Sequence, residues 1–142
     1  MVQKLSVLVL LAVCSMEDLK TKRIHTVWLK VFAAEGLAGT ILLWQRPVYE
    51  LILAMTPGMF FLLLAFAAHG GIGEGDGLVL IIMGFFLKPS LILGMLVLAV
   101  FLSAGYALFL FIAQKKNRKY EIPFIPFLLA AYVGEIAAVK YF

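Results

Sequence analysis

With 142 residues, of which 64% are hydrophobic and only 14% are charged, this chain does not have the composition of a soluble domain. Such domains are usually about 45–50% apolar and about 25% charged, so the sequence indicates an integral membrane protein. The formal net charge of +4 does not indicate nucleic-acid binding, because the basic residues cluster at the ends of apolar runs, where they set membrane topology. One cysteine excludes an internal disulfide, and two histidines are too few to predict a metal site.

Six apolar segments are expected to cross the membrane, each judged against the roughly 20 residues that span a bilayer as a helix. The first and the fourth are shorter than this. The sixth contains Pro123 and Pro126, which a helix tolerates in its first turns. The expected segments are Leu5–Met16, Val27–Trp44, Leu51–Ala68, Leu78–Leu87, Leu91–Ala113 and Ile122–Val139. The sequence therefore predicts an all-α polytopic transmembrane helical bundle of about six helices, with residues 1–142 as a single membrane-embedded domain.

The first segment has a second interpretation. Lys4, a short apolar core and Cys14 are also the pattern of a secretory signal or a lipoprotein cleavage site. Val13 precedes this cysteine, where such sites favour a small residue, and further membrane helices follow. The sequence therefore favours a first helix that is retained.

The basic residues are distributed unevenly between the two sides of the predicted bundle. Eight lie in or beside the first and fifth connections, and the other four are divided among the termini and the second and fourth connections. Positively charged loops stay in the cytoplasm, so the odd-numbered connections are expected to face inward. The third connection has no lysine or arginine. Its side of the membrane follows only from the number of crossings that separate it from the first and fifth connections. Asp18 and Asp76 are then expected on the same, cytoplasmic, face.

Glycines interrupt the apolar sequence between the third and fourth segments, in the run Gly70-Gly71-Ile72-Gly73-Glu74-Gly75-Asp76-Gly77. Acidic residues here lie at or just below a membrane surface, where charge is costly and usually functional. Asp18, at the end of the first segment, offers a partner for Asp76. Two carboxyl groups held close together share a proton, so that one acts as general base on a water and the other as general acid. This pair predicts peptide hydrolysis without a metal or a covalent intermediate.

The glycines around Asp76 fit the same interpretation. Glycine lets the main chain approach a substrate and adopt positive φ, which favours Gly73, Gly75 and Gly77 as part of a substrate site. A plainer alternative is that Asp18 caps a loop and that the glycines form a tight turn. The residues alone leave both interpretations open.

Three stretches, in order along the chain, resemble one known family. Gly73-Glu74-Gly75-Asp76 matches the GxGD signature of the intramembrane aspartyl proteases. Asp18-Leu19-Lys20-Thr21-Lys22-Arg23-Ile24 resembles the first aspartate segment of the type IV prepilin peptidases. Ile122-Pro123-Phe124-Ile125-Pro126-Phe127 is similar to the late I-P-F-G-P-F motif of the same family. Larger members carry an N-terminal methyltransferase region with paired cysteines, so the single Cys14 implies a short form without methyl transfer.

The resemblance implies an aspartic endopeptidase that crosses the cytoplasmic membrane several times. Its active site is expected to face the cytoplasm. Such enzymes cleave the basic leader peptide from type IV prepilin-like or archaeal flagellin-like precursors. It implies Asp18 and Asp76 as the catalytic pair, and no metal or cofactor. The implied partners are precursor proteins and the lipid bilayer, with no nucleic acid. Gly73, Glu74, Gly75 and Gly77 are implied to bind substrate.

Acidic residues near the inner face are expected to attract the basic leaders of such substrates. Glu17, Glu74 and Glu121 are the candidates; the alternative for each is a plain surface charge, which is the favoured interpretation for Glu121. Glu35 and Glu135 lie inside predicted helices, where an acid needs a partner. A structural hydrogen bond between helices is the favoured role for these two.

Three positions depart from the family's usual pattern. His25-Thr26 stand where Pro-Asn is common, Leu78 stands where lysine is common, and Ile125 replaces a glycine. These departures keep two other functions open. One is a non-catalytic component of a pilus or secretion assembly. The other is a small ion or proton transporter subunit, in which Glu35, Glu135 and Asp76 line a path across the membrane.

Overall fold

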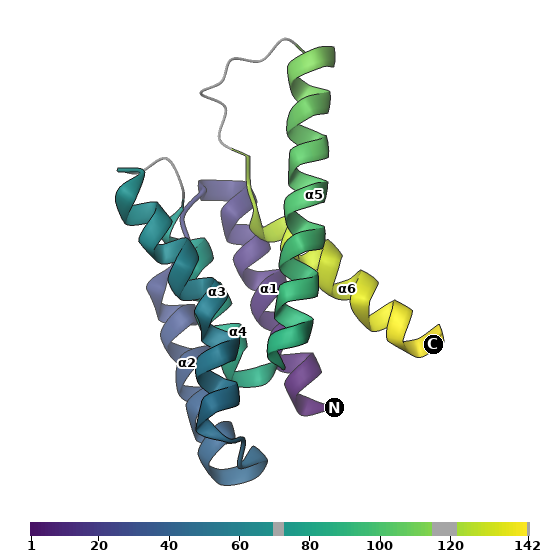
Figure 1. The fold of residues 1–142 in the computed structure, drawn as a ribbon. Helices are drawn as coiled ribbons and strands as arrows, with labels where there is room; N and C mark the ends of the chain where they lie inside the picture. Colours follow the sequence, from purple (N-terminus) through teal and green to yellow (C-terminus); the bar gives the residue numbers. More distant parts are fainter. Residues whose placement is uncertain (70–72, 115–121, 142) are drawn as a thin grey trace.

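The computed structural model describes residues 1–69, 73–114 and 122–141, except for the side chains of residues 140 and 141. These residues form a bundle of antiparallel helices, drawn in chain order from purple to yellow in Figure 1. The elements are α1 (Val2–Thr21), α2 (Thr26–Gly39) continued by one π-helical turn η1 (Thr40–Trp44), α3 (Val48–Ala67), α4 (Glu74–Phe86), α5 (Pro89–Ala113) and α6 (Ile125–Tyr141). The all-α helical bundle predicted from the apolar segments is confirmed.

Several boundaries differ from the prediction: the third helix begins at Val48 instead of Leu51, and the fourth begins at Glu74 instead of Leu78, which places Asp76 inside it. The first helix continues to Thr21 and ends with Lys22 in the left-handed conformation, at φ 53°. Asp18 therefore lies inside the last helical turn instead of after it. The sixth helix begins at Ile125, so Pro123 precedes the helix and only Pro126 lies in its first turn. A residue followed by proline is pushed towards extended backbone, which explains why the helix does not begin at Ile122.

Successive helices run in opposite directions, which divides the molecule into two ends. The end where α1 and α3 finish and α4 begins is called here the aspartate end; the end where α1 begins and α2 and α4 finish is called the far end (Figure 1). Asp18 and Asp76 both belong to the aspartate end. The two acids were predicted to lie on the same side of the bundle, and the directions of α1 and α4 place them at the same end.

In the part of the chain that the structure describes, three helical stretches are long and apolar enough to cross a membrane: Thr26–Trp44, Val48–Ala67 and Pro89–Ala113. The helix α4 has 13 residues and spans about 20 Å, less than the roughly 30 Å of a bilayer's hydrocarbon core. Large apolar side chains are exposed along the outside of the bundle, among them Leu42, Phe60 and Phe101. Lipid tails solvate such a surface, and the molecule is a membrane protein.

The short helix α4 is the centre of the fold. It packs against α1, α2, α3 and α5, and it buries Val79, Leu80 and Met83 completely. Glycines let α3 approach it closely. A Cβ on Gly77 would lie 2.9 Å from the backbone nitrogen of Leu62, and one on Gly58 would lie 2.5 Å from that of Ile81. Small residues at helix crossings allow this backbone contact in membranes, and the contact fixes the position of Asp76 relative to α3.

Candidate active site

The first candidate acid, Asp18, is buried between α1 and the start of α6. Its side chain lies in the last turn of α1, and the residue is 9% exposed. Asp18 Oδ2 accepts a hydrogen bond from the backbone N–H of Ile125, 3.3 Å away. The first N–H groups of a helix have no partner within the helix, and a carboxylate at this position also interacts favourably with the helix dipole. The proline-rich stretch that begins α6 therefore holds Asp18 in place.

The second candidate acid, Asp76, lies in the first turn of α4. The backbone N–H of Asp76 donates to the carbonyl oxygen of Gly73, 3.2 Å away, and Gly73 is the N-cap residue of α4. The carboxyl group folds back towards this glycine, because a Cβ on Gly73 would lie 3.3 Å from Asp76 Oδ2. The glycine thus leaves room for the acid at the start of its own helix.

The charge of Asp18 influences the carboxyl group of Asp76. Burial raises the pKa of Asp76 to about 7, and the negative charge of Asp18 acts in the same direction. Burial also raises the pKa of Asp18, while the N–H of Ile125 and the positive charge of Lys22 lower it. Both acids lie outside the three stretches that can span a membrane. The pKa of both acids is raised, but groups that stabilise the ionised form are found only at Asp18, and such a difference suits paired general acid and base chemistry.

The other glycines of this stretch contact the protein itself. A Cβ on Gly75 would lie 2.9 Å from Cδ1 of Ile24, in the connection between α1 and α2. Gly77 faces the backbone of α3 at Leu62. Gly73 and Glu74 are exposed at the aspartate end. The glycines therefore bring α3 and the α1–α2 connection up to Asp76, and their contact with substrate stays a prediction.

The connection between α1 and α2 is tied down beside the two acids by a contact that the sequence did not reveal. Glu17 Oε2 accepts a hydrogen bond from the backbone N–H of His25 at 2.9 Å, and Glu17 Oε1 lies 2.9 Å from His25 Nδ1. Thr21 Oγ1 donates to the carbonyl oxygen of Arg23 across the same connection. In the sequence, only the unusual histidine at position 25 pointed to this contact. Glu17 and His25 become neighbours only after the chain has turned, so their spacing did not predict it. Glu121, the third acid proposed to attract substrate, lies outside the described residues.

The two remaining acids considered, Glu35 and Glu135, each contact a neighbouring helix. Ser6 Oγ donates to Glu35 Oε1 at 2.5 Å, which joins α1 to α2 and confirms the predicted hydrogen bond between helices. Ser6 precedes Asp18 by twelve residues, or about 18 Å along a helix, so Glu35 is remote from the aspartate end. Glu135 contacts α5, because a Cβ on Gly94 would lie 2.5 Å from its Oε1. Within residues 1–69, 73–114 and 122–139, no group of three His, Cys, Asp or Glu side chains is arranged to hold a metal ion.

Residues 5–108 match the model of the type IV leader peptidase family. The matched region contains Asp18 and the glycine-rich stretch up to Asp76, and it ends before the proline-rich stretch 122–127. The chain matches no curated protein and no solved structure. The contact between Asp18 and Ile125 therefore joins the matched region to a segment outside it.

Proposed function

Because this chain belongs to the type IV leader peptidase family, we propose that it is a membrane aspartic endopeptidase. Its substrates are type IV prepilin-like or archaeal flagellin-like precursors, from which it removes the basic leader peptide. Asp18 and Asp76 are the catalytic pair. The observation that supports this function is the position of the two acids at the same end of the bundle, Asp18 in the last turn of α1 and Asp76 in the first turn of α4, where the charge of Asp18 helps to raise the pKa of Asp76.

Asp18 is the general base of the proposed reaction. The N–H of Ile125 and the charge of Lys22 favour its ionised form, which accepts a proton from a water held between the acids. The water oxygen then bonds to the carbon of the scissile amide. Asp76, protonated near neutral pH, donates its proton to the carbonyl oxygen. This yields an uncharged tetrahedral diol.

The second half of the reaction returns both acids to their starting forms. Asp18 gives the proton it took from water to the amide nitrogen, and the C–N bond breaks. The hydroxyl proton of the diol returns to Asp76 as the new carboxyl group forms. The products are the leader peptide and a mature protein with a free amino group. No metal and no covalent intermediate enters these steps.

The substrate meets the site at the aspartate end of the bundle. Glu74 is exposed in the first turn of α4, beside Asp76, and its charge favours a basic leader. The lipid-facing surface of the bundle continues from this end, so the hydrophobic helix of a precursor can remain in the bilayer while its leader reaches the acids. The basic residues around the first and fifth connections support a cytoplasmic orientation of this end.

Cleavage of a prepilin-like precursor by the purified protein tests this function. The wild-type protein is expected to produce a shortened precursor, and Asp18→Asn and Asp76→Asn are each expected to reduce the rate by at least about a thousandfold, since each removes a proton-transfer group. Glu135→Gln is the matched control, because it removes a carboxylate remote from both aspartates; its rate should stay near that of the wild type.

Two results would contradict the proposal. Full activity of either asparagine variant rejects the aspartate mechanism. A wild-type protein that binds the precursor but never shortens it favours a non-catalytic assembly component. A transporter subunit would instead predict that Glu35→Gln and Glu135→Gln are as damaging as the change at Asp76.

A further inference from the structure

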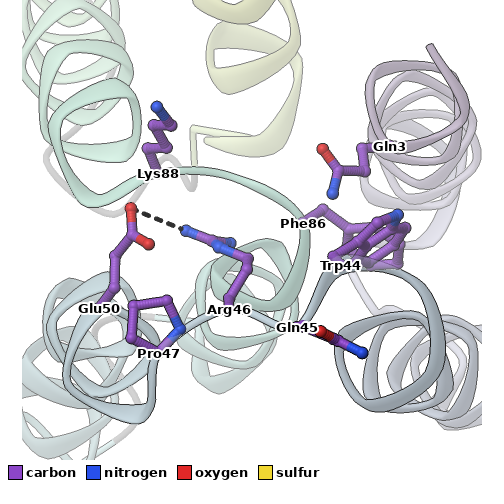
Figure 2. A pocket seen from close by; sticks show the side chains of 8 residues that line it. All are labelled: Gln3, Trp44, Gln45, Arg46, Pro47, Glu50, Phe86 and Lys88. Carbon is purple, nitrogen blue, oxygen red and sulfur yellow. Dashed lines mark ion pairs between the residues drawn. The ribbon is translucent and has the colours of Figure 1, made fainter.

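A second polar site lies at the far end of the bundle, away from the two aspartates. It is a pocket of about 390 Å³ between the start of α1, the connection from η1 to α3, and the end of α4 (Figure 2). This volume falls within the range of small-molecule sites in proteins, roughly 300–1,000 Å³. Its lining residues are Gln3, Trp44, Gln45, Arg46, Pro47, Glu50, Phe86 and Lys88. The site thus combines polar and charged side chains with two aromatic rings.

Arg46 is the most constrained of these side chains. It is only 10% exposed, and its Nη1 donates to the carbonyl oxygens of Gly84 at 3.3 Å and Phe85 at 3.4 Å, in the last turn of α4. Its Nη2 has no hydrogen-bond partner in the described part of the chain; Glu50 Oε1 is 3.6 Å away. A buried donor without a hydrogen bond is costly and calls for a ligand. The guanidinium group is therefore fixed in position, and its Nη2 can still donate a hydrogen bond.

The charges around this pocket favour an anion. Arg46 and Lys88 are positive, and Glu50 is the one acidic residue in the lining, which leaves an excess of one positive charge. Lys88 is exposed, and its side chain makes no hydrogen bond or ion pair among residues 1–69, 73–114 and 122–139, although its backbone carbonyl oxygen accepts from Leu91 and Ile92. Figure 2 shows its side chain above Arg46, on the same side of the pocket as Glu50. One free guanidinium N–H and a lysine ammonium lining the same pocket are donors that phosphate groups accept from.

The surroundings of the pocket favour a lipid as the source of this anion. The side chains that flank it on η1 and α3, Leu42, Leu43, Val48 and Tyr49, are each more than 70% exposed and face the region occupied by lipid. Trp44 has the amphipathic ring that is typical of the membrane interface. From Asp76 to Phe86 the helix α4 rises by about 15 Å, so the pocket lies no farther out than the headgroups of the opposite leaflet.

We propose that this pocket binds the phosphate group of a phospholipid from the leaflet opposite to the aspartates. Arg46 Nη2 and Lys88 donate to phosphate oxygens, and the acyl chains run along the exposed apolar residues of η1 and α3. The bound phosphate supplies the hydrogen bond that Arg46 Nη2 lacks. The proposal concerns binding alone and does not depend on peptidase activity.

Native mass spectrometry of the detergent-purified protein, titrated with phosphatidylglycerol, tests the proposal. The wild-type protein is expected to hold one lipid molecule. Arg46→Gln and Lys88→Gln should each weaken its affinity roughly tenfold, the effect of losing one charge-assisted hydrogen bond. Lys30→Gln is the matched control, because it removes an exposed lysine from the outside of α2, and its affinity should equal that of the wild type. Diacylglycerol, which lacks the phosphate, should bind the wild-type protein and all three variants equally weakly.

Three results would overturn the proposal. Equal lipid affinity in Lys88→Gln and Lys30→Gln excludes a phosphate at this pocket, and this comparison holds even if Arg46→Gln unfolds, since the hydrogen bonds of Lys88 to α5 come from its backbone, which the substitution keeps. Equal binding of diacylglycerol and phosphatidylglycerol by the wild-type protein shows that the acyl chains alone are recognised. Displacement of the lipid by inorganic phosphate at similar concentrations identifies a site for the free anion instead of a lipid.

Discussion

The two aspartates differ in the groups that surround their carboxyl oxygens. Burial raises the pKa of Asp18, while the N–H that it accepts from Ile125 and the charge of Lys22 oppose this rise. At Asp76, burial and the negative charge of Asp18 both raise the pKa. Neighbouring carboxyl groups whose pKa values are pushed apart can serve as base and acid at the same pH. The asymmetry therefore supports the assignment of Asp18 as base and Asp76 as acid.

Cleavage is expected to slow as the pH rises through about 7, the pKa of Asp76. The raised pKa means that Asp76 holds its proton below this value and loses it above, and the reaction needs the protonated form. Initial rates of precursor cleavage, measured across the neutral range, check this. A rate that continues to increase on the alkaline side of neutrality would contradict the role of Asp76 as acid.

The coupling between the acids can be measured without a substrate. Asp18→Asn removes a negative charge that raises the pKa of Asp76, so the pKa of Asp76 should fall in this variant. Infrared titration of the protonated carboxyl band, compared between wild type and Asp18→Asn, follows the change. Glu135→Gln serves as the control and should leave that band's midpoint unchanged. An unshifted midpoint in Asp18→Asn would show that the two groups do not interact.

At the scale of the helices, α4 sets the position of Asp76 through two close contacts. Gly77 lies against the backbone of α3 at Leu62, and Gly75 lies against the side chain of Ile24. A backbone cannot move aside as easily as the end of a flexible side chain. The contact at Gly77 is therefore the one that tolerates no larger residue.

Gly77→Ala should destabilise the protein by about 1–3 kcal/mol, the usual cost of forcing an extra methyl group into a packed contact. Gly75→Ala should cost less, because Ile24 Cδ1 can rotate away from the new Cβ. Gly105→Ala is the control: nothing lies within 4 Å of its Cβ position, so alanine should be neutral or stabilise α5 by about 0.5–1 kcal/mol. Thermal unfolding in detergent ranks the three variants, and equal losses at Gly77 and Gly105 would reject the close contact.

The sequence predicted the helices because each is a continuous apolar run between polar breaks. It did not predict the contacts that join them. The hydrogen bond between Asp18 and Ile125 links residues 107 positions apart, and Arg46 reaches the end of α4 from 38 positions away. Neither spacing carries a periodic signal. The pairing of Glu17 with His25 depends on how the α1–α2 connection turns, which local residue preferences do not determine.

At the scale of the whole molecule, a short central helix connects two polar sites at opposite ends of the bundle. The helix α4 carries Asp76 in its first turn and has its last carbonyl groups bonded by Arg46. Three longer apolar stretches provide the surface in contact with lipid. Because α4 is surrounded by other helices, it does not need to span the full bilayer itself. This arrangement supports an active site at one membrane surface, reached by a substrate helix that stays in the lipid.

The central claim is that acids from two distant segments, α1 and α4, meet at one end of the bundle. Cysteines placed by Asp18→Cys and Asp76→Cys in a Cys14→Ala background, treated with a short bifunctional thiol reagent, test this claim most directly. The account predicts rapid cross-linking within one chain for this pair, and none for a control pair made by Asp18→Cys and Lys88→Cys, at opposite ends of the bundle. Failure of the first pair to cross-link, or equal cross-linking of both pairs, would contradict it.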